Sequence, residues 1–251
     1  LADNSLFVID SGHRKQSSDA AQSGLMDFMY QITDQPYGSK INIKSWFISH
    51  AHGDHVYLSS AFLETYHDNL NIESMLYNIP SFQTMSSGYD SGTFLMKQSM
   101  NTYFPDMKFV KLHTGQTFDI QGVNFEVLHT HEDAVNENGV NRITDFNDTS
   151  TTIRLTIDGK TFILLGDSGQ VAMGDMLNMY AASTLKSDVV QIAHHGYNDL
   201  ADLYAAIDAP LAIVPNSEIN AKDNNPTIYE GYAKPGVTVL FADPDTYKLT
   251  V

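Results

Sequence analysis

Four side chains that can bind metal ions stand within six residues, in the stretch His50-x-His52-x-Asp54-His55. Imidazole and carboxylate groups are ligands for zinc, manganese and iron. In so short a segment, two histidines can face one metal ion while the Asp-His pair faces another. Gly53 lies inside the motif and permits backbone angles that a side chain would forbid. The spacing therefore predicts a metal site rather than an exposed polar loop that happens to be rich in histidine.

Several elements must position this motif. An apolar run over residues 41–48 predicts a buried strand that ends directly before it. Apolar residues at helical spacing predict an amphipathic helix over residues 18–32 and another over residues 58–66. Residues 6–9 predict a short strand that ends in the turn Asp10-Ser11-Gly12. The motif itself is expected on the loop between the strand and the second helix.

Further candidate ligands follow strands that are predicted later in the chain. Residues 123–128 alternate between apolar and polar and predict one strand. Apolar runs at residues 161–165 and 187–193 predict two more, the first of them paired through a hairpin at Asp158-Gly159 with a strand over residues 147–157. Each of these strands ends at a candidate ligand or a pair of them: His129 and His131, Asp167, and His194 and His195.

The first motif, followed in order by a histidine, an aspartate and a histidine after later strands, resembles the signature of the metallo-β-lactamase superfamily. The resemblance implies an α/β (α+β) fold, the four-layer αββα sandwich, formed by a single domain over residues 1–251. It implies two divalent metal ions, with zinc expected and manganese or iron as alternatives. The implied ligands are His50, His52 and His131 for one metal, Asp54, His55 and His194 for the other, and Asp167 as the bridge. His129 in place of His131, and His195 in place of His194, are open alternatives.

A second group of residues indicates one branch of this superfamily. The pattern Asn147-x-x-Ser150, the Gly-Asp pair at residues 166–167 and the His-His-Gly element at residues 194–196 are similar to the hydrolase domain of the DNA-uptake channel protein ComEC and its stand-alone relatives. Two positions depart from that pattern. Tyr197 stands where those domains carry serine, and His52 stands where they often carry aspartate.

The resemblance implies a binuclear metal-dependent hydrolase. A metal-bound hydroxide would attack a phosphodiester, ester or lactone of a small molecule. Asp54 and His195 are the expected catalytic groups for orienting the nucleophile and carrying a proton, and Arg14 and Tyr197 are expected to contact the substrate. Two other classes stay open: a catalytically silent module that binds a metal or ligand on the same fold, and an iron-dependent oxidoreductase.

Composition narrows the partners. The chain has 251 residues, and 14 basic against 30 acidic side chains give a formal charge of 14 − 30 = −16. This negative field repels polyanions, so a small-molecule substrate is expected rather than a long nucleic acid.

The chain has no cysteine, which limits metal ligands to His, Asp and Glu. No apolar run has the length of a membrane span. The start at Leu1 and the absence of cysteine favour an exported or cell-surface protein. Nothing in the sequence indicates the oligomeric state.

Overall fold

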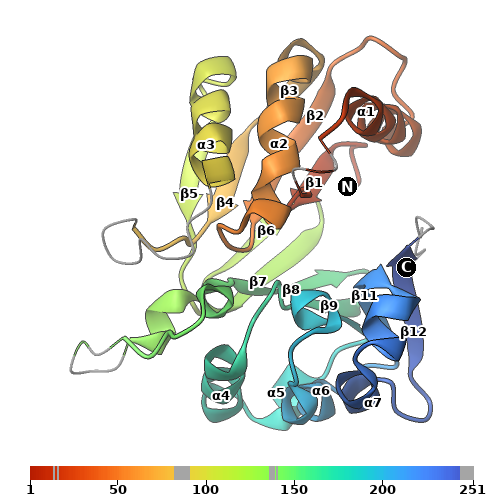
Figure 1. Ribbon diagram of the computed structural model, residues 1–251. Coiled ribbons are helices and arrows are strands. Elements are labelled where there is room, and N and C mark those ends of the chain that lie inside the picture. Colours follow the sequence, from red (N-terminus) through yellow and green to blue (C-terminus); the bar gives the residue numbers. More distant parts are fainter. Residues whose placement is uncertain (14, 16, 82–90, 136–138, 140, 244–251) are drawn as a thin grey trace. The chain divides into compact units, whose positions relative to one another are not determined.

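The computed structural model describes residues 1–13, 15, 17–81, 91–135, 139 and 141–243, and the chain divides into two compact units (Figure 1). Unit 1 comprises Leu1–Leu112 and Ile120–Gly122, and unit 2 comprises His113–Asp119 and Val123–Val251. None of the described helices combines the length and the apolar character that crossing a bilayer requires. The single domain over residues 1–251 stays a prediction.

Unit 1 is built on a parallel sheet in which β2 pairs with β1, β3 and β4, and β4 pairs with β5. Its strands are β1 (Leu6–Ile9), β2 (Ile41–Ile48), β3 (Leu70–Ile72), β4 (Ser74–Tyr77) and β5 (Lys108–Lys111). Its helices are α1 (Asp19–Thr33), α2 (Gly53–Tyr66) and α3 (Ser91–Tyr103), with a 3-10 turn at His67–Asn69. The three helices share one apolar core with the sheet, in which Trp46, Phe62 and Met96 are wholly buried. The strand and helix predicted before the motif are confirmed.

The helix after the motif begins earlier than the sequence predicts. His52 has the extended backbone of an N-cap (φ −76°, ψ 151°), and the chain turns helical at Gly53 rather than near residue 58. The prediction that all four motif side chains lie on a loop is therefore wrong. Asp54 and His55 lie in the first turn of α2, where their spacing is set by helical geometry.

Unit 2 is built on a sheet in the order β12-β11-β10-β9-β8-β7-β6, in which the neighbours from β9 to β12 are parallel and β7, β8 and β9 are antiparallel. Its strands are β6 (Thr117–Ile120), β7 (Val123–His129), β8 (Thr152–Ile157), β9 (Lys160–Leu164), β10 (Val189–Gln191), β11 (Leu211–Ser217) and β12 (Thr238–Asp243). Its helices are α4 (Gln170–Met179), α5 (Ala182–Leu185), α6 (Ala201–Ile207) and α7 (Pro226–Tyr232), and they pack in one apolar core with the strands. Figure 1 shows these helices beside the sheet.

The strands predicted in unit 2 are confirmed, two of them with shorter bounds. Asp158 and Gly159 have φ angles of 48° and 78°, as a two-residue hairpin with both central residues left-handed requires. The strand predicted over residues 147–157 begins only at Thr152, because Phe146–Thr149 form a 3-10 turn. The strand predicted over residues 187–193 is limited to Val189–Gln191.

Candidate metal centre

The pairing of β1 with β2 places Asp10 beside the motif. The strands are parallel and Ile9 lies opposite Phe47, so their carboxyl ends meet at the same edge of the sheet. The Asp10 amide donates a 2.8 Å hydrogen bond to the Phe47 carbonyl, and the Trp46 indole Nε1 donates to the Asp10 carbonyl at 3.0 Å. Asp10 has a left-handed backbone with φ of 53°, which aspartate tolerates better than most residues.

The Asp10 carboxylate determines where two motif histidines carry their protons. It accepts hydrogen bonds from the Ser49 amide at 2.7 Å, the Ser49 hydroxyl at 2.7 Å and His55 Nδ1 at 2.8 Å. Because the only hydroxyl proton of Ser49 points to Asp10, Ser49 Oγ accepts from His50 Nδ1 at 3.1 Å. Both histidines therefore carry the proton on Nδ1 and offer the Nε2 electron pair, the arrangement that carboxylate-supported metal ligands adopt.

The Nε2 atoms of His50 and His55 lie near other candidate ligand atoms of unit 1. His50 Nε2 lies 3.0 Å from His52 Nδ1, and His55 Nε2 lies 3.9 Å from Asp54 Oδ2. Two ligand atoms on one tetrahedral zinc ion are about 3.3 Å apart, since each is about 2 Å from the metal. The first turn of α2 adds the positive end of the helix dipole beside Asp54, which favours the carboxylate form. These residues fit a metal.

The sequence indicates a turn at Asp10-Ser11-Gly12, and the superfamily resemblance implies a similar Asp-x-Gly turn beneath the metals, but neither indicates which groups the Asp10 carboxylate contacts. The missing information is the pairing of β1 with β2, which brings Asp10 to Ser49 and His55 across a long stretch of chain. An isolated aspartate at the end of a short strand gives no sign of this pairing.

In unit 2 the parallel pairing of β9 with β10 brings two predicted segments together. Leu164 lies opposite Gln191, so the turn at Asp167 and the turn at residues 193–196 emerge at the same edge. Gln191 fixes the first turn, because its Oε1 accepts from the Leu165 and Gly166 amides at 2.9 and 2.8 Å and its Nε2 donates to the Gly166 carbonyl at 3.1 Å.

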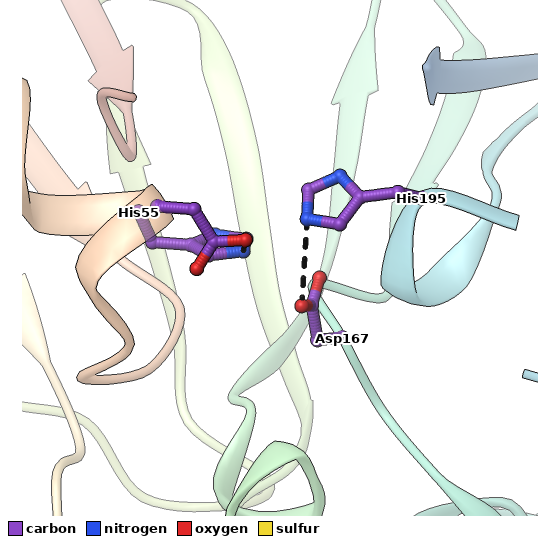
Figure 2. A group of neighbouring side chains, drawn as sticks. His55, Asp167 and His195 are labelled. Carbon is purple, nitrogen blue, oxygen red and sulfur yellow. Dashed lines mark ion pairs between the residues drawn. The ribbon is translucent and has the colours of Figure 1, made fainter. Parts of the chain in front are cut away.

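Asp167 is buried and its backbone is held on both sides. Its amide donates to Ser150 Oγ at 3.0 Å, and its carbonyl accepts from Asn198 Nδ2 at 3.2 Å. Figure 2 shows its carboxylate facing His195, with Oδ2 3.6 Å from His195 Nε2. His195 Nδ1 lies 3.2 Å from the Pro215 carbonyl, which can only accept, so in neutral His195 the Nε2 atom is unprotonated. The Nε2 electron pair of His195 and the carboxylate of Asp167 repel each other, and a cation between them would offset this repulsion. This pair of side chains therefore also fits a metal.

Both ring nitrogens of His194 already have amide partners. Asn198 Nδ2 donates to the carbonyls of Asp167 and Ser168, which orients the amide so that its Oδ1 accepts from His194 Nδ1 at 2.9 Å. Asn147 Nδ2 lies 3.4 Å from His194 Nε2. The described geometry therefore favours His195 over His194 as the ligand of this element, while His194 as a ligand stays a prediction.

The turn that carries both histidines has an unusual backbone. His194, His195 and Gly196 all have positive φ, at 49°, 54° and 82°. Non-glycine residues in this region cost about 1 to 2 kcal/mol each and persist where the surroundings enforce them, which is common at functional sites. Asn198, together with Asn216 Nδ2, which donates to the His195 carbonyl at 2.9 Å, supplies that enforcement.

The histidines after β7 have different surroundings. His129 is wholly buried, and its Nε2 lies 3.4 Å from Asp175 Oδ2, while Arg142 donates to Asp175 Oδ1 at 2.7 Å. Burial raises the pKa of the Asp175 carboxyl, but the hydrogen bonds from His129 and Arg142 outweigh it, and the net pKa lies below its ordinary value. His129 thus belongs to a hydrogen-bonded network with Asp175 and Arg142. His131 is half-buried at the first residue of the 3-10 turn His131–Ala134, and its ligand role stays a prediction.

The structure says less about the remaining predicted site residues, Arg14 and Tyr197. Arg14 lies outside the described residues. Tyr197 is 42% exposed, and its ring meets the His194 ring edge-on at 5.8 Å between centroids. Its exposure suits a substrate contact, and that role stays a prediction.

Comparison with known proteins identifies the fold. No family model and no curated protein sequence matches the chain. Among solved structures it is similar to the metallo-β-lactamase fold protein YhfI from Bacillus subtilis, with 12% identity, a TM-score of 0.50 and coverage of 96% of this chain and 86% of that one. It is similar to Tm1679, a metal-dependent hydrolase of the β-lactamase superfamily, with 13% identity, a TM-score of 0.52 and coverage of 93% and 85%. It also resembles a variant of the β-hydroxylase CmlA, with 10% identity, a TM-score of 0.50 and coverage of 84% and 44%. The chain, a mixed α/β protein with two sheets and their helices, has the metallo-β-lactamase fold.

Proposed function

We propose that this protein is a metal-dependent hydrolase that cleaves a phosphodiester, ester or lactone bond of a small molecule. The observation that carries the proposal is the Asp10 network. One carboxylate, directly and through Ser49, keeps the proton of His50 and His55 on Nδ1, so that Nε2 is the ring atom of each that could bind a metal. The structural similarity to Tm1679, a metal-dependent hydrolase, supports the same class.

The proposed ligands follow the predicted set with one change. His50, His52 and His131 would hold one metal, and Asp54 and His55 would hold the other. Asp167 would be a ligand shared by both, and His195 rather than His194 would complete the second site. The change rests on the amide partners of both His194 nitrogens and on the 3.6 Å approach of His195 Nε2 to Asp167. Zinc is the proposed metal, because imidazole and carboxylate groups are the usual ligands of catalytic zinc sites.

Bound divalent metals would lower the pKa of a water molecule and polarise the scissile bond. The protein's own residues then have three tasks. Asp10 and Ser49 keep the ligating histidines in one tautomer, and Asp54 orients the nucleophile at the start of α2. Tyr197 and Arg14 are the proposed substrate contacts. The resemblance of Asn147-x-x-Ser150 to ComEC-type domains puts phosphodiesters first, and the charge of −16 restricts them to small ones.

The test is hydrolysis of bis-p-nitrophenyl phosphate and of p-nitrophenyl acetate by metal-free protein and by protein supplied with zinc or manganese. We expect activity that requires the metal and falls at least a hundredfold in His52→Ala and Asp167→Ala. Hydrolytic activity should fall as far in His195→Gln, and less in His194→Gln. No hydrolysis by metal-loaded protein would leave the silent binding module as the better description.

One observation favours a second candidate, an iron-dependent oxidoreductase. The β-hydroxylase CmlA shares the fold at a TM-score of 0.50, so the fold alone does not separate hydrolysis from oxidation. Bound iron together with dioxygen consumption would favour this candidate. Zinc or manganese with hydrolysis and no dioxygen consumption would exclude it.

A further inference from the structure

Unit 1 contains a cavity of about 500 Å³ between α3 and the strands β4 and β5. This volume lies within the range of about 300 to 1,000 Å³ that is usual for small-molecule sites. Most of the wall is apolar, and it is formed by Met75, Ile79, Pro80, Phe94, Met96 and Phe109. A wall of this kind suits the hydrocarbon or aromatic body of a ligand.

Both charged residues among the described lining residues of this cavity are basic. Lys97 of α3 and Lys111 of β5 line it, and no aspartate or glutamate is among its described lining residues. The chain as a whole has 30 acidic and only 14 basic side chains. Two lysines at one apolar cavity in so acidic a protein therefore indicate a ligand with an anionic group.

The cavity adjoins the metal-binding motif within unit 1. Strands β2 and β4 are parallel neighbours with Ile48 opposite Tyr77, so the motif after β2 and the cavity wall after β4 lie at the same edge of the sheet. Thr93 lines the cavity and donates a 2.9 Å hydrogen bond to the carbonyl of Ala51, which stands between His50 and His52. Ligands of open parallel sheets bind at this carboxyl edge.

We propose that the cavity binds an amphipathic anion, with the apolar body between α3 and the sheet and the carboxylate, sulfate or phosphate at Lys97 and Lys111. We further assign the cavity as the binding site for the apolar part of the substrate. That second assignment rests on the proposed hydrolase function. The first does not, because it concerns binding alone.

Binding is tested by titrating metal-free protein with decanoate in a calorimeter, with decyltrimethylammonium and acetate as the charge and chain-length comparisons. Decanoate should bind at least tenfold more tightly than either. The double variant Lys97→Gln/Lys111→Gln should weaken decanoate binding at least fivefold. Lys108→Gln is the matched control, because Lys108 is exposed on the same strand and does not line the cavity. Ile79→Trp should fill the cavity and abolish binding while the thermal unfolding profile stays cooperative.

Decanoate binding that is unaffected by both the lysine and the Ile79 variants, or that is matched by decyltrimethylammonium, would overturn the site. The substrate assignment is tested separately in metal-loaded protein. Decanoate should inhibit hydrolysis competitively, and the double lysine variant should raise the inhibition constant at least fivefold. Binding without competition would overturn the substrate assignment. Failure of the hydrolase proposal would show as absent turnover and would leave the metal-free titration unchanged.

Discussion

Asp10 has a central role at the residue scale, although it need not touch a metal itself. Its two oxygens receive three donors, two from Ser49 and one from His55. A partner of this kind fixes the tautomer of a ligating histidine and raises its basicity. The metal affinity of unit 1 should therefore depend on a residue outside the motif.

Replacing Asp10 by asparagine tests this dependence. The amide retains one acceptor but presents a donor to His55 Nδ1 or to Ser49, so the Nε2 electron pair is no longer secured. We expect zinc affinity to fall about 10- to 100-fold with the fold retained, as measured by competition with a chelator. Asp34→Asn is the matched control, because Asp34 also has a left-handed backbone and its side chain is exposed. Equal affinities in Asp10→Asn and the wild type would contradict the role.

The buried Asp175 network gives a pH-dependent prediction. The folded pKa of Asp175 lies below its ordinary value, so its contribution to stability is present above the unfolded pKa and is lost as the pH falls through the folded pKa. Asp175→Asn should lower the free energy of unfolding by about 2 kcal/mol at pH 7. The difference from wild type should shrink as the pH falls below about 4.

Urea unfolding from pH 3 to 7 measures this difference. Asp208→Asn serves as the control, because the ion pair of Asp208 with Lys186 is exposed at the surface and should contribute much less. A difference at Asp175 that is the same at every pH would show that packing, rather than the charge, is responsible.

At the scale of elements, polar side chains outside the ligand set hold the turns of unit 2. Gln191 and Ser150 fix the backbone around Asp167, and Asn198 joins the Asp167 turn to His194. Asn147 and Ser150 belong to the Asn147-x-x-Ser150 pattern, from which the sequence predicts a ComEC-type relative. Their contacts show that these two residues support the site turns through hydrogen bonds.

Asp148 has the same kind of role at the start of α4. Its Oδ1 accepts from the Gly169 and Ala172 amides at 3.1 and 3.3 Å, while burial raises the pKa of its carboxyl. A raised folded pKa means that ionisation opposes folding, so stability is lost as the pH rises from the unfolded pKa through the folded one. Asp148→Asn keeps an acceptor without the charge and should be at least as stable as wild type at pH 7. Asp148→Ala should lose about 1 to 2 kcal/mol.

Thermal unfolding at pH 7 and pH 4 distinguishes these variants. Any advantage of Asp148→Asn over wild type should be smaller at pH 4, where the wild-type carboxyl is more protonated. An asparagine variant as unstable as the alanine variant would contradict this account of Asp148.

Some helices and strands could be predicted from the sequence, and others could not. The strand before the motif and the helix of α1 follow from local periodicity, and both are confirmed. The start of α2 at Gly53 is missed, because the apolar pattern becomes helical only after Asp54 and His55. The preference for His195 over His194 depends on two left-handed residues and on amide contacts from Asn147 and Asn198, which spacing alone does not reveal.

At the scale of the whole molecule, the order of candidate ligand types along the chain indicates the fold better than overall sequence identity does. Sequence identities to the similar solved structures are only 10 to 13%, yet the metallo-β-lactamase fold was predictable from one short motif and the candidate ligands after later strands. Within each sheet, parallel strands bring their carboxyl ends to one edge, so candidate ligands that follow neighbouring parallel strands, such as β9 and β10, emerge at the same edge. The contacts of the Asp10 carboxylate fall outside that reasoning, because they depend on the pairing of β1 with β2.

The measurement that tests the account most directly is the metal content of protein purified without added metal, by elemental analysis. About two equivalents of zinc or manganese are predicted, falling to about one or fewer in His52→Ala and in His195→Gln. A content below about half an equivalent that does not rise after incubation with zinc or manganese would contradict the metal centre. The hydrolase proposal would fall with it.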